Sequence, residues 1–180
     1  MELDGVGLWT DLQRPLRQLA LGGGTPNFLF AEDMERLIRG IESRMSIAAD
    51  AERSIEVDPR AITPQYVRML VELGFNRFSM GVQDLDDDVM AAVNRPQALA
   101  TVTEVVRAIR ATGDLPINMD LIYGLPRQSV ESWTRTLDQV TELRPSRLAI
   151  YGYAHVPWMK KHQTALERHH IPDDTLRAQL

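Results

Sequence analysis

The sequence predicts an α/β fold, an incomplete parallel (β/α) barrel with about five βα units. Short apolar runs typical of buried strands alternate with longer segments whose apolar residues recur every three or four positions. The runs begin roughly 25–40 residues apart, which leaves room for a crossover helix between parallel strands. Five units are too few to close a barrel of eight. We therefore expect the chain to form a piece of a larger barrel-like domain.

Five segments are expected to form the strands, each bounded by glycine or proline or by the start of a helical pattern. They are residues 19–21, 54–59, 78–82, 117–123 and 147–151. Apolar stripes at helical spacing fill the intervals, over residues 34–45, 67–71, 99–109 and 133–143. Polar residues at the starts of helices predict N-terminal caps. They are Thr63 before Pro64, Asp86 to Asp88, Ser129 with Ser132, and Asp173.

Composition excludes several classes of function. The chain has 180 residues, 44% of them hydrophobic, which is enough to build the core of one domain. A net charge of −5 argues against a nucleic-acid-binding surface. No apolar stretch could span a membrane and no signal-peptide pattern is present, so we expect a cytoplasmic protein. The absence of cysteine excludes disulfides and thiolate metal sites within these residues.

The stretch over residues 19–26 organises the chain. A short apolar run meets Gly22, Gly23 and Gly24, and Thr25 and Pro26 follow. Without Cβ atoms, this backbone can approach a ligand closely and adopt positive φ angles. A strand end of this kind suits an amino, carboxylate or phosphate group. A tight turn with nothing bound is an equally good interpretation of the triplet alone.

Polar residues also occur toward the carboxyl ends of the other predicted strands, where the active sites of parallel α/β folds lie. They are Glu56 with Asp58, Gln83 with Asp84, Asp120, and Tyr153 with His155. Together they indicate a pocket for a polar, hydroxyl-bearing ligand such as a nucleoside. Structural alternatives exist: Glu56 could pair with an arginine, and Gln83 and Asp84 could satisfy loop backbone groups. For Asp120, which lies inside an apolar strand, the energetic penalty of burial favours a function.

Three histidines, His162, His169 and His170, share one predicted helical face. No carboxylate partner accompanies them in the pattern, and His155 stands alone. We therefore expect no metal site in this chain.

Six motifs occur in order from the glycine stretch onward, at residues 22–26, 54–59, 74–83, 93–97, 120–126 and 153–157. Together they resemble the radical S-adenosylmethionine enzymes of porphyrin synthesis, and most closely the oxygen-independent coproporphyrinogen III oxidase (dehydrogenase) family. Related haem chaperones and methyltransferases share the Gly-Gly-Gly-Thr-Pro and Gly-Val-Gln elements. They usually lack the segments found here at 93–97 and 153–157, which favours the oxidase.

The resemblance implies a partial barrel of the radical S-adenosylmethionine type that binds S-adenosyl-L-methionine, two molecules per active site. It implies coproporphyrinogen III as substrate, two propionates of which become vinyl groups to give protoporphyrinogen IX. A monomeric parent enzyme with no nucleic-acid or membrane partner is expected. The cofactor-binding positions that it implies are Gly23, Gly24, Thr25, Glu56, Gln83, Arg95, Asp120 and Ala154. The glycines and Thr25 would receive the methionine end, Glu56 the ribose hydroxyls, and the backbone of Ala154 the adenine edge.

The chain departs from the family in one respect that decides its chemistry. The family's 4Fe-4S cluster is held by a Cys-x-x-x-Cys-x-x-Cys loop upstream of the glycine stretch, and this chain has no cysteine. We therefore predict no catalytic residue and no metal ligand, and a chain that is inactive alone. Residues 1–180 are expected to be a partial core domain without the family's C-terminal part. Residues 1–17, with Leu8, Leu12 and Leu16, would be a remnant of the preceding helix, and 158–180 the start of the connection that follows.

Three hypotheses remain open: a piece of a true oxidase, a piece of a haem-binding relative that is not an oxidase, and a cluster-free relic that binds a nucleoside or a porphyrin. All three share one expected architecture. It has at least four parallel strands in sequential order, helices on the outer face, and an open sheet edge before Leu19.

Overall fold

A single five-stranded sheet organises the computed structural model, which describes residues 14–180. The strands are β1 (Leu16–Leu21), β2 (Ile47–Val57), β3 (Arg77–Gln83), β4 (Ile117–Tyr123) and β5 (Arg147–Gly152). All neighbouring pairs are parallel, and their order in space equals their order in the chain. The predicted part of a parallel (β/α) barrel is thereby confirmed.

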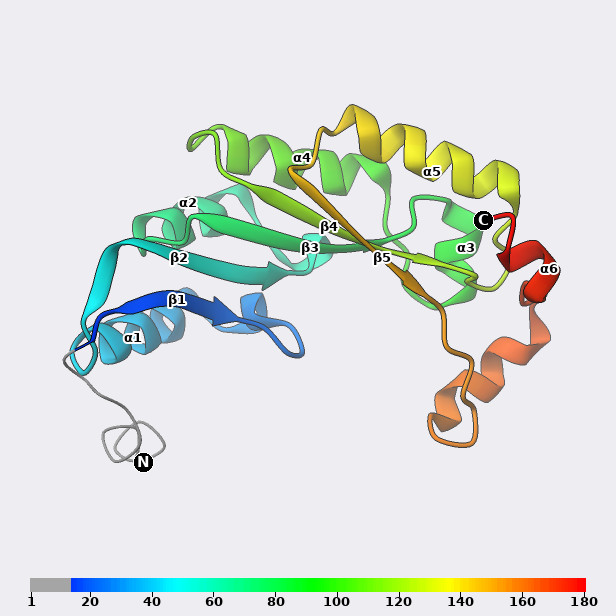
Figure 1. Ribbon diagram of the computed structural model, residues 1–180, viewed down its shortest axis with the longest axis horizontal. Coiled ribbons are helices and arrows are strands. Elements are labelled where there is room, and N and C mark those ends of the chain that lie inside the picture. Colours follow the sequence, from blue (N-terminus) through cyan, green and yellow to red (C-terminus); the bar gives the residue numbers. More distant parts are fainter. Residues whose placement is uncertain (1–13) are drawn as a thin grey trace.

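Helices connect successive strands. They are α1 (Ala31–Glu42), α2 (Pro64–Glu72), α3 (Asp87–Ala92), α4 (Leu99–Arg110), α5 (Val130–Glu142) and α6 (Asp174–Arg177), with short 3-10 segments η2 (Pro26–Phe28), η3 (Pro59–Ala61) and η4 (Lys161–Arg168). In Figure 1 the connecting helices lie along the back and the upper side of the sheet, and none crosses in front of it. The sheet therefore has a covered outer face and an uncovered inner face. No helix in the described part of the chain is long and apolar enough to cross a membrane.

Alternation along the strands separates an apolar outer face from a polar inner face. The outward residues of β2, β3 and β4 are at most 3% exposed and pack with the helices into one core; they are Ile55, Val57, Phe78, Met80, Val82, Ile117, Met119 and Leu121. The residues between them point inward and are mostly polar, as at Glu56, Ser79, Asn118 and Asp120. An inner face of this polarity is suited to a ligand.

The predicted helix caps are confirmed. The side chain of Thr63 accepts a hydrogen bond from the backbone N–H of Tyr66, next to Pro64 at the start of α2. Asp86 caps α3 in the same way, and Ser129 with Ser132 forms a reciprocal capping box on α5. The acidic cluster at 86–88 is therefore a cap and first turn, as predicted.

Two boundaries differ from the prediction. Leu16, assigned to a helix remnant, begins β1, and its N–H donates to the carbonyl of Ser46 at 2.8 Å. Leu8 and Leu12, the rest of that pattern, lie outside the described residues. Strand β2 begins at Ile47, well before the expected start at Ser54, because pairing with β1 extends a segment of low intrinsic strand preference.

Within residues 14–180, each of the two edge strands pairs with a neighbour on one side only. There β1 pairs with β2 alone and β5 with β4 alone. The expected open edge at β1 is therefore present in the described part. Beyond β5 the chain leaves the sheet and returns through η4 and α6, where the N–H of Arg127 donates to the carbonyl of His170 at 2.7 Å.

Candidate cofactor-binding site

The carboxyl ends of β1 to β4 enclose a polar pocket of about 160 Å³. Its lining is Gly24, Thr25, Glu56, Val57, Asp58, Ser79, Gly81, Gln83, Arg95 and Asp120. The structure thus brings together most of the cofactor-binding positions that the resemblance implied. Residues from four separate strand ends meet here because the strands are parallel and adjacent.

The glycine stretch and Glu56 form one unit. The N–H of Gly23 donates to Oε2 of Glu56 at 3.2 Å. A Cβ atom built on Gly22 would lie 2.8 Å from Oε1 of the same carboxylate, so this close approach requires glycine. Gly23 and Gly24 have φ angles of 79° and 70°, which glycine adopts without strain. The backbone of this strand end is therefore shaped around a carboxylate.

Glu56 is available to a ligand. Its side chain is exposed, and no arginine in the described part of the chain lies within ion-pair distance of it. The alternative in which Glu56 is a structural acid paired with an arginine is therefore not supported. One carboxylate oxygen bonds the glycine backbone, and the remaining acceptor capacity faces the pocket.

Asp58 supports the site from beneath. Its Oδ2 pairs with Nη2 of Arg60 at 2.7 Å and with Nη2 of Arg95 at 3.3 Å. Burial alone would raise the pKa of this carboxyl, but hydrogen bonds from Arg60 and the charges of Arg95 and Arg60 hold it below the usual value. Buried Asn27, which the sequence analysis missed, braces the same turn by accepting from the N–H of Asp58 at 2.9 Å.

Arg95 reaches into the pocket from the loop after α3. Its Nη2 donates to the carbonyl of Gly81 at 3.0 Å, and burial lowers the pKa of the guanidinium while Asp58 opposes that shift. Its Nε is buried and has no hydrogen-bond partner among residues 14–180. A buried donor without a partner is rare and marks a place where a ligand acceptor can bind.

Asp120 belongs to a hydrogen-bonded triad on the inner face. Nδ2 of Asn118 donates to Oδ1 of Asp120 at 2.8 Å and to Oγ of Ser79 at 2.7 Å, and Ser79 donates to Oδ2 of Asp120 at 3.3 Å. This arrangement fixes the carboxylate at the pocket wall. The sequence analysis missed Ser79 and Asn118, although each lies two positions before a pocket residue and so shares its face of the strand.

Gln83 and Asp84 separate at the end of β3. Gln83 takes a left-handed backbone conformation with a φ of 68°, where the β3–β4 register shifts, and it lines the pocket. Asp84 turns away, is fully buried, and accepts from the backbone N–H groups of Leu85 and Asp86 and from Oγ1 of Thr136. Its expected place in the ligand pocket was therefore wrong, and the structural alternative holds for Asp84 alone.

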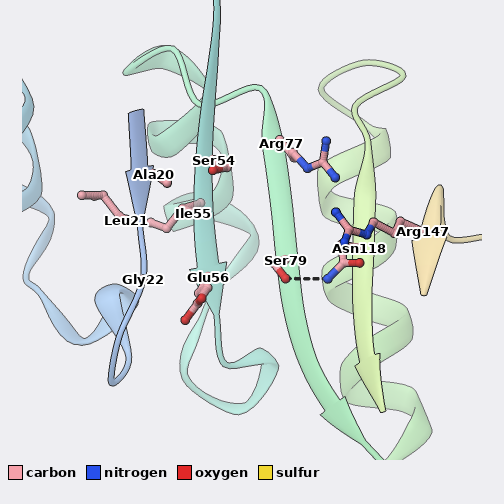
Figure 2. A pocket seen from close by; sticks show the side chains of 10 residues that line it. All are labelled: Ala20, Leu21, Gly22, Ser54, Ile55, Glu56, Arg77, Ser79, Asn118 and Arg147. Atoms are coloured by element: carbon pink, nitrogen blue, oxygen red, sulfur yellow. Dashed lines mark hydrogen bonds between the residues drawn. The ribbon is translucent and has the colours of Figure 1, made fainter. Parts of the chain in front are cut away.

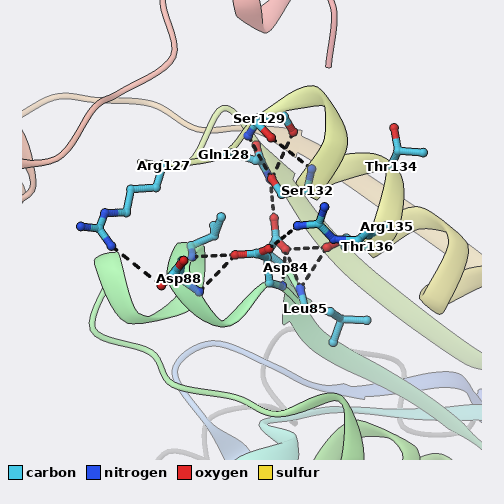
Figure 3. A network of polar contacts seen from close by, with 12 residues as sticks. Asp84, Leu85, Asp88, Arg127, Gln128, Ser129, Ser132, Thr134, Arg135 and Thr136 are labelled. Carbon is cyan, nitrogen blue, oxygen red and sulfur yellow. Dashed lines mark hydrogen bonds and ion pairs between the residues drawn. The ribbon is translucent and has the colours of Figure 1, made fainter.

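A network continues from Asp84 to α5 (Figure 3). Nε2 of Gln128 donates to Oδ2 of Asp84, while Oε1 of Gln128 accepts from the N–H groups of Gly124 and Leu125. Burial raises the pKa of the Asp84 carboxyl, although hydrogen bonds from Thr136, Asp86, Gln128 and Leu85 partly oppose that shift. The network joins the ends of β3 and β4 to the start of α5.

The residues after β5 lie away from the Glu56–Asp120 pocket. Oη of Tyr153 and Nδ1 of His155 are 3.4 Å apart, and Nε2 of His155 is 3.3 Å from Oε1 of Glu167. Tyr153 lines a neighbouring hollow of about 800 Å³ that also includes Gln83 and Arg95. Ala154 lines neither space; its carbonyl accepts from Nε2 of Gln163 at 3.1 Å. The structure therefore does not place Ala154 with the other predicted cofactor residues.

An iron–sulfur cluster has no cysteine ligand in this chain. Cysteine is absent from the sequence, and no group of three or more histidine or acidic side chains within the described residues is placed to hold a metal ion. The side chain of His162 lies outside the described part. The residues present therefore fit a polar organic ligand and do not fit the cluster.

Comparison with known proteins identifies the family. The model of the Radical SAM superfamily matches residues 9–140. The oxygen-independent coproporphyrinogen III oxidase of Cereibacter sphaeroides is 41% identical over 163 residues, which cover 91% of this chain and 36% of the relative. The solved coproporphyrinogen III oxidase of Escherichia coli superposes with a TM-score of 0.86 at 39% identity, over 92% of this chain and 38% of that one.

A more distant solved structure shares the fold alone. The radical S-adenosylmethionine methyltransferase of Kitasatospora setae has a TM-score of 0.66 at 12% identity, over 78% of this chain and 28% of that one. The present chain spans little more than a third of the length of the oxidases that it matches. Because the family model covers most of the chain and the sheet has the matching parallel half-barrel form, this chain belongs to the Radical SAM superfamily.

Proposed function

We propose that this chain is the S-adenosyl-L-methionine-binding part of an oxygen-independent coproporphyrinogen III oxidase, with coproporphyrinogen III as the substrate of the whole enzyme. The observation that carries the proposal is the contact between the glycine stretch and Glu56, in which the Gly23 N–H donates to the carboxylate at 3.2 Å. The identity of 41% to a curated oxidase over 91% of the chain supports it. A cytoplasmic, monomeric parent enzyme belongs to the same proposal because the family resemblance implies both.

The donor set fits S-adenosyl-L-methionine. The free acceptor capacity of Glu56 suits the ribose hydroxyls, and the bare backbone at Gly23 and Gly24 suits the methionine end. The unpartnered Nε of Arg95 offers a donor for an anionic group, and Asp120, which also lines the pocket, offers a fixed acceptor. A ligand with a carboxylate, an ammonium group and a diol uses each of these features.

The oxidase-specific segment at 93–97 is built into this pocket. Arg95 bonds the carbonyl of Gly81, and Nε2 of buried Gln97 donates to the carbonyl of Val82 at 2.8 Å. Both contacts fix the end of β3, where Gln83 faces the ligand space. This observation favours the oxidase over the haem-binding relatives, which usually lack the segment.

The family's use of two cofactor molecules also belongs to the proposal. Gln83 and Arg95 line both the strand-end pocket and the adjoining hollow of about 800 Å³, so a second molecule there would share them. Ala154, whose backbone was expected at the adenine edge, lies immediately beyond that hollow's Tyr153. In the family, the cofactor supplies a 5′-deoxyadenosyl radical when it is bound to a reduced cluster. This chain holds no thiolate for that cluster, so its own part is binding and orientation.

Isothermal titration of the chain with S-adenosyl-L-methionine tests the proposal. Hydrogen bonds to a charged group contribute about 1.5–3 kcal/mol, so Glu56→Ala should weaken binding about 10- to 100-fold. Glu56→Gln should weaken it less, because the amide keeps one acceptor. The melting temperature should be unchanged in both variants, because Glu56 is exposed.

Glu104→Gln is the matched control, since Glu104 is an exposed acid on α4 remote from the strand ends. It should bind the cofactor as the unmodified chain does. Unchanged affinity in both Glu56 variants, with a lowered melting temperature, would show a structural acid and overturn the assignment.

A further inference from the structure

The inner face of the sheet carries a second polar site beside the cofactor pocket (Figure 2). Strand register places Glu56, Ser79, Asn118 and Arg147 in one row across β2, β3, β4 and β5. They line a hollow of about 150 Å³ together with Arg77. Glu56 and Ser79 also line the cofactor pocket, so the two spaces adjoin.

The hollow contains two arginines with different surroundings. Arg77 is neutralised, because its Nη1 pairs with Oε2 of Glu52 at 2.9 Å. The side chain of Arg147 makes no hydrogen bond or ion pair with any residue in the described part of the chain. Its side chain is exposed at the start of β5 and lies beside Asn118 in Figure 2. A guanidinium without a counter-ion presents a donor fork whose geometry matches a carboxylate.

The side chain of Asn118 lacks a hydrogen-bond donor for its amide oxygen within residues 14–180. It is only 8% exposed, and its Nδ2 is committed to Ser79 and Asp120. Its Oδ1 is buried and accepts no hydrogen bond from any described residue. A buried amide oxygen without a donor is unfavourable, so a ligand that supplies an N–H or O–H is favoured there.

The carboxylates on this face are already occupied. Glu52 is paired with Arg77, and Asp120 accepts from Ser79 and Asn118. Glu56 bonds Gly23 and faces the cofactor pocket. Of the two arginines that line this hollow, Arg147 is therefore the one without a carboxylate partner among the described residues, and it can bind an anion.

We propose that Arg147 and Asn118 bind one propionate-bearing pyrrole ring of the substrate. Arg147 binds the propionate carboxylate, and Oδ1 of Asn118 accepts the pyrrole N–H. This inference rests on the proposed function, which makes the substrate a tetrapyrrole with propionate side chains. It assigns to Arg147 a role in substrate specificity: a macrocycle without carboxylates would lose this contact. The shared Ser79 wall places the bound ring next to the cofactor pocket.

Absorbance titration of the chain with coproporphyrin III, the stable oxidised form of the macrocycle, tests the carboxylate contact. Arg147→Ala should weaken binding at least about tenfold, as expected for a lost charge-assisted pair. Arg147→Lys should restore part of the affinity, since it keeps the charge and loses the fork. Arg36→Ala on the outer face of α1 is the matched control and should bind as the unmodified chain does. The tetramethyl ester of the porphyrin should bind weakly and equally to all four proteins.

A single-ring probe tests the amide contact. The amide signals of residues 117–119 and 147 should shift on addition of 2,4-dimethylpyrrole-3-propionate, and less on addition of its N-methyl analogue. Equal affinity of Arg147→Ala and the Arg36→Ala control, or tight binding of the ester, would overturn the inference.

The titration with S-adenosyl-L-methionine separates this inference from the proposed function. Arg147→Ala should bind the cofactor normally, because Arg147 does not line the cofactor pocket. If the chain bound no cofactor but showed Arg147-dependent porphyrin binding, the proposed cofactor function would fail and the substrate contact would stand.

Discussion

The charged residues of this site are held in place by ion pairs and hydrogen bonds with their neighbours. Arg95 is positioned by Asp58 at 3.3 Å and by the carbonyl of Gly81 at 3.0 Å, and its buried Nε has no hydrogen-bond partner among the described residues. Asp58 itself is held by Arg60 and by the turn that follows β2. An arginine on a flexible stem becomes a fixed donor only through such supports.

The variant Gly22→Ala tests whether the close approach of Glu56 to the glycine stretch is needed for binding. Gly22→Ala places a Cβ 2.8 Å from Oε1 of Glu56 and must displace that carboxylate. We expect S-adenosyl-L-methionine affinity to fall about as far as in Glu56→Ala, by roughly 10- to 100-fold. Calorimetric titration of the variant measures it.

Gly40→Ala is the matched control. A Cβ on Gly40 meets only Nη1 of Arg44, at 4.0 Å, and the residue lies inside α1. This variant should gain about 0.5–1 kcal/mol in the free energy of unfolding, because alanine is the better helix former. Its cofactor affinity should not change. Normal affinity in Gly22→Ala would show that the close approach of Glu56 is not needed for binding.

At the scale of elements, the ends of β3 and β4 are held by α5. Oγ1 of Thr136 donates to Asp84 at 2.6 Å from within that helix, and Gln128 bonds the turn after β4. Gln83 is the last residue of β3, and Asp120 lies in the middle of β4. The buried network thus fixes the relative position of two pocket walls without lining the pocket.

Thr136→Val tests this network through its pH dependence. Burial raises the pKa of Asp84 above its ordinary value of 3.8 despite the Thr136 bond, so the folded state keeps a proton that the unfolded state has released. The free energy of unfolding therefore falls as pH rises from below 3.8 through the native pKa. Removing the hydrogen bond from Thr136 should raise the pKa of Asp84 further, because in the unmodified chain that bond lowers it.

The destabilisation caused by Thr136→Val should consequently grow with pH. It should be small below pH 3.8, where Asp84 is protonated in both states, and reach about 1.5–3 kcal/mol at pH 7. Urea unfolding over this range measures it. Thr134→Val, on the same helix, removes an exposed bond to the carbonyl of Val130 and should show no such trend. A pH-independent loss in Thr136→Val would mean that Asp84 does not ionise in the folded chain.

At the scale of the whole molecule, most of the sheet follows from local pattern. The segment 117–123 was predicted with the bounds that β4 has, because apolar residues and terminal Gly124 and Pro126 delimit it. The early part of β2 could not be predicted, since its strand form depends on pairing with β1. Leu16 matched a helical spacing by chance and joined the sheet instead.

The candidate site, like the sheet, could be predicted only in part from the sequence. Glu56, Gln83, Arg95 and Asp120 could be predicted because they occur in sequence motifs, and all four line one pocket. Asn27, Ser79, Asn118 and Arg147 stand outside the roles considered, and only register across strands brings the last three into one row. Asp84 shows the converse, because two adjacent polar residues at a strand end point to opposite sides once Gln83 adopts a positive φ. Which residues line the pocket therefore depends on contacts between distant segments, which the local sequence pattern does not contain.

Backbone amide mapping shows where on the chain S-adenosyl-L-methionine binds. A titration of the isotope-labelled chain with S-adenosyl-L-methionine, followed by nitrogen–proton correlation spectra, reports every ordered amide at once. We predict that the largest shifts occur at residues 22–25, 56–58, 81–83 and 120, the strand ends that form the pocket. The amides on the outer surfaces of α1 and α4 should not move. Saturable shifts confined to another surface, or no shift at a cofactor concentration that saturates the calorimetric titration, would contradict this account of the site.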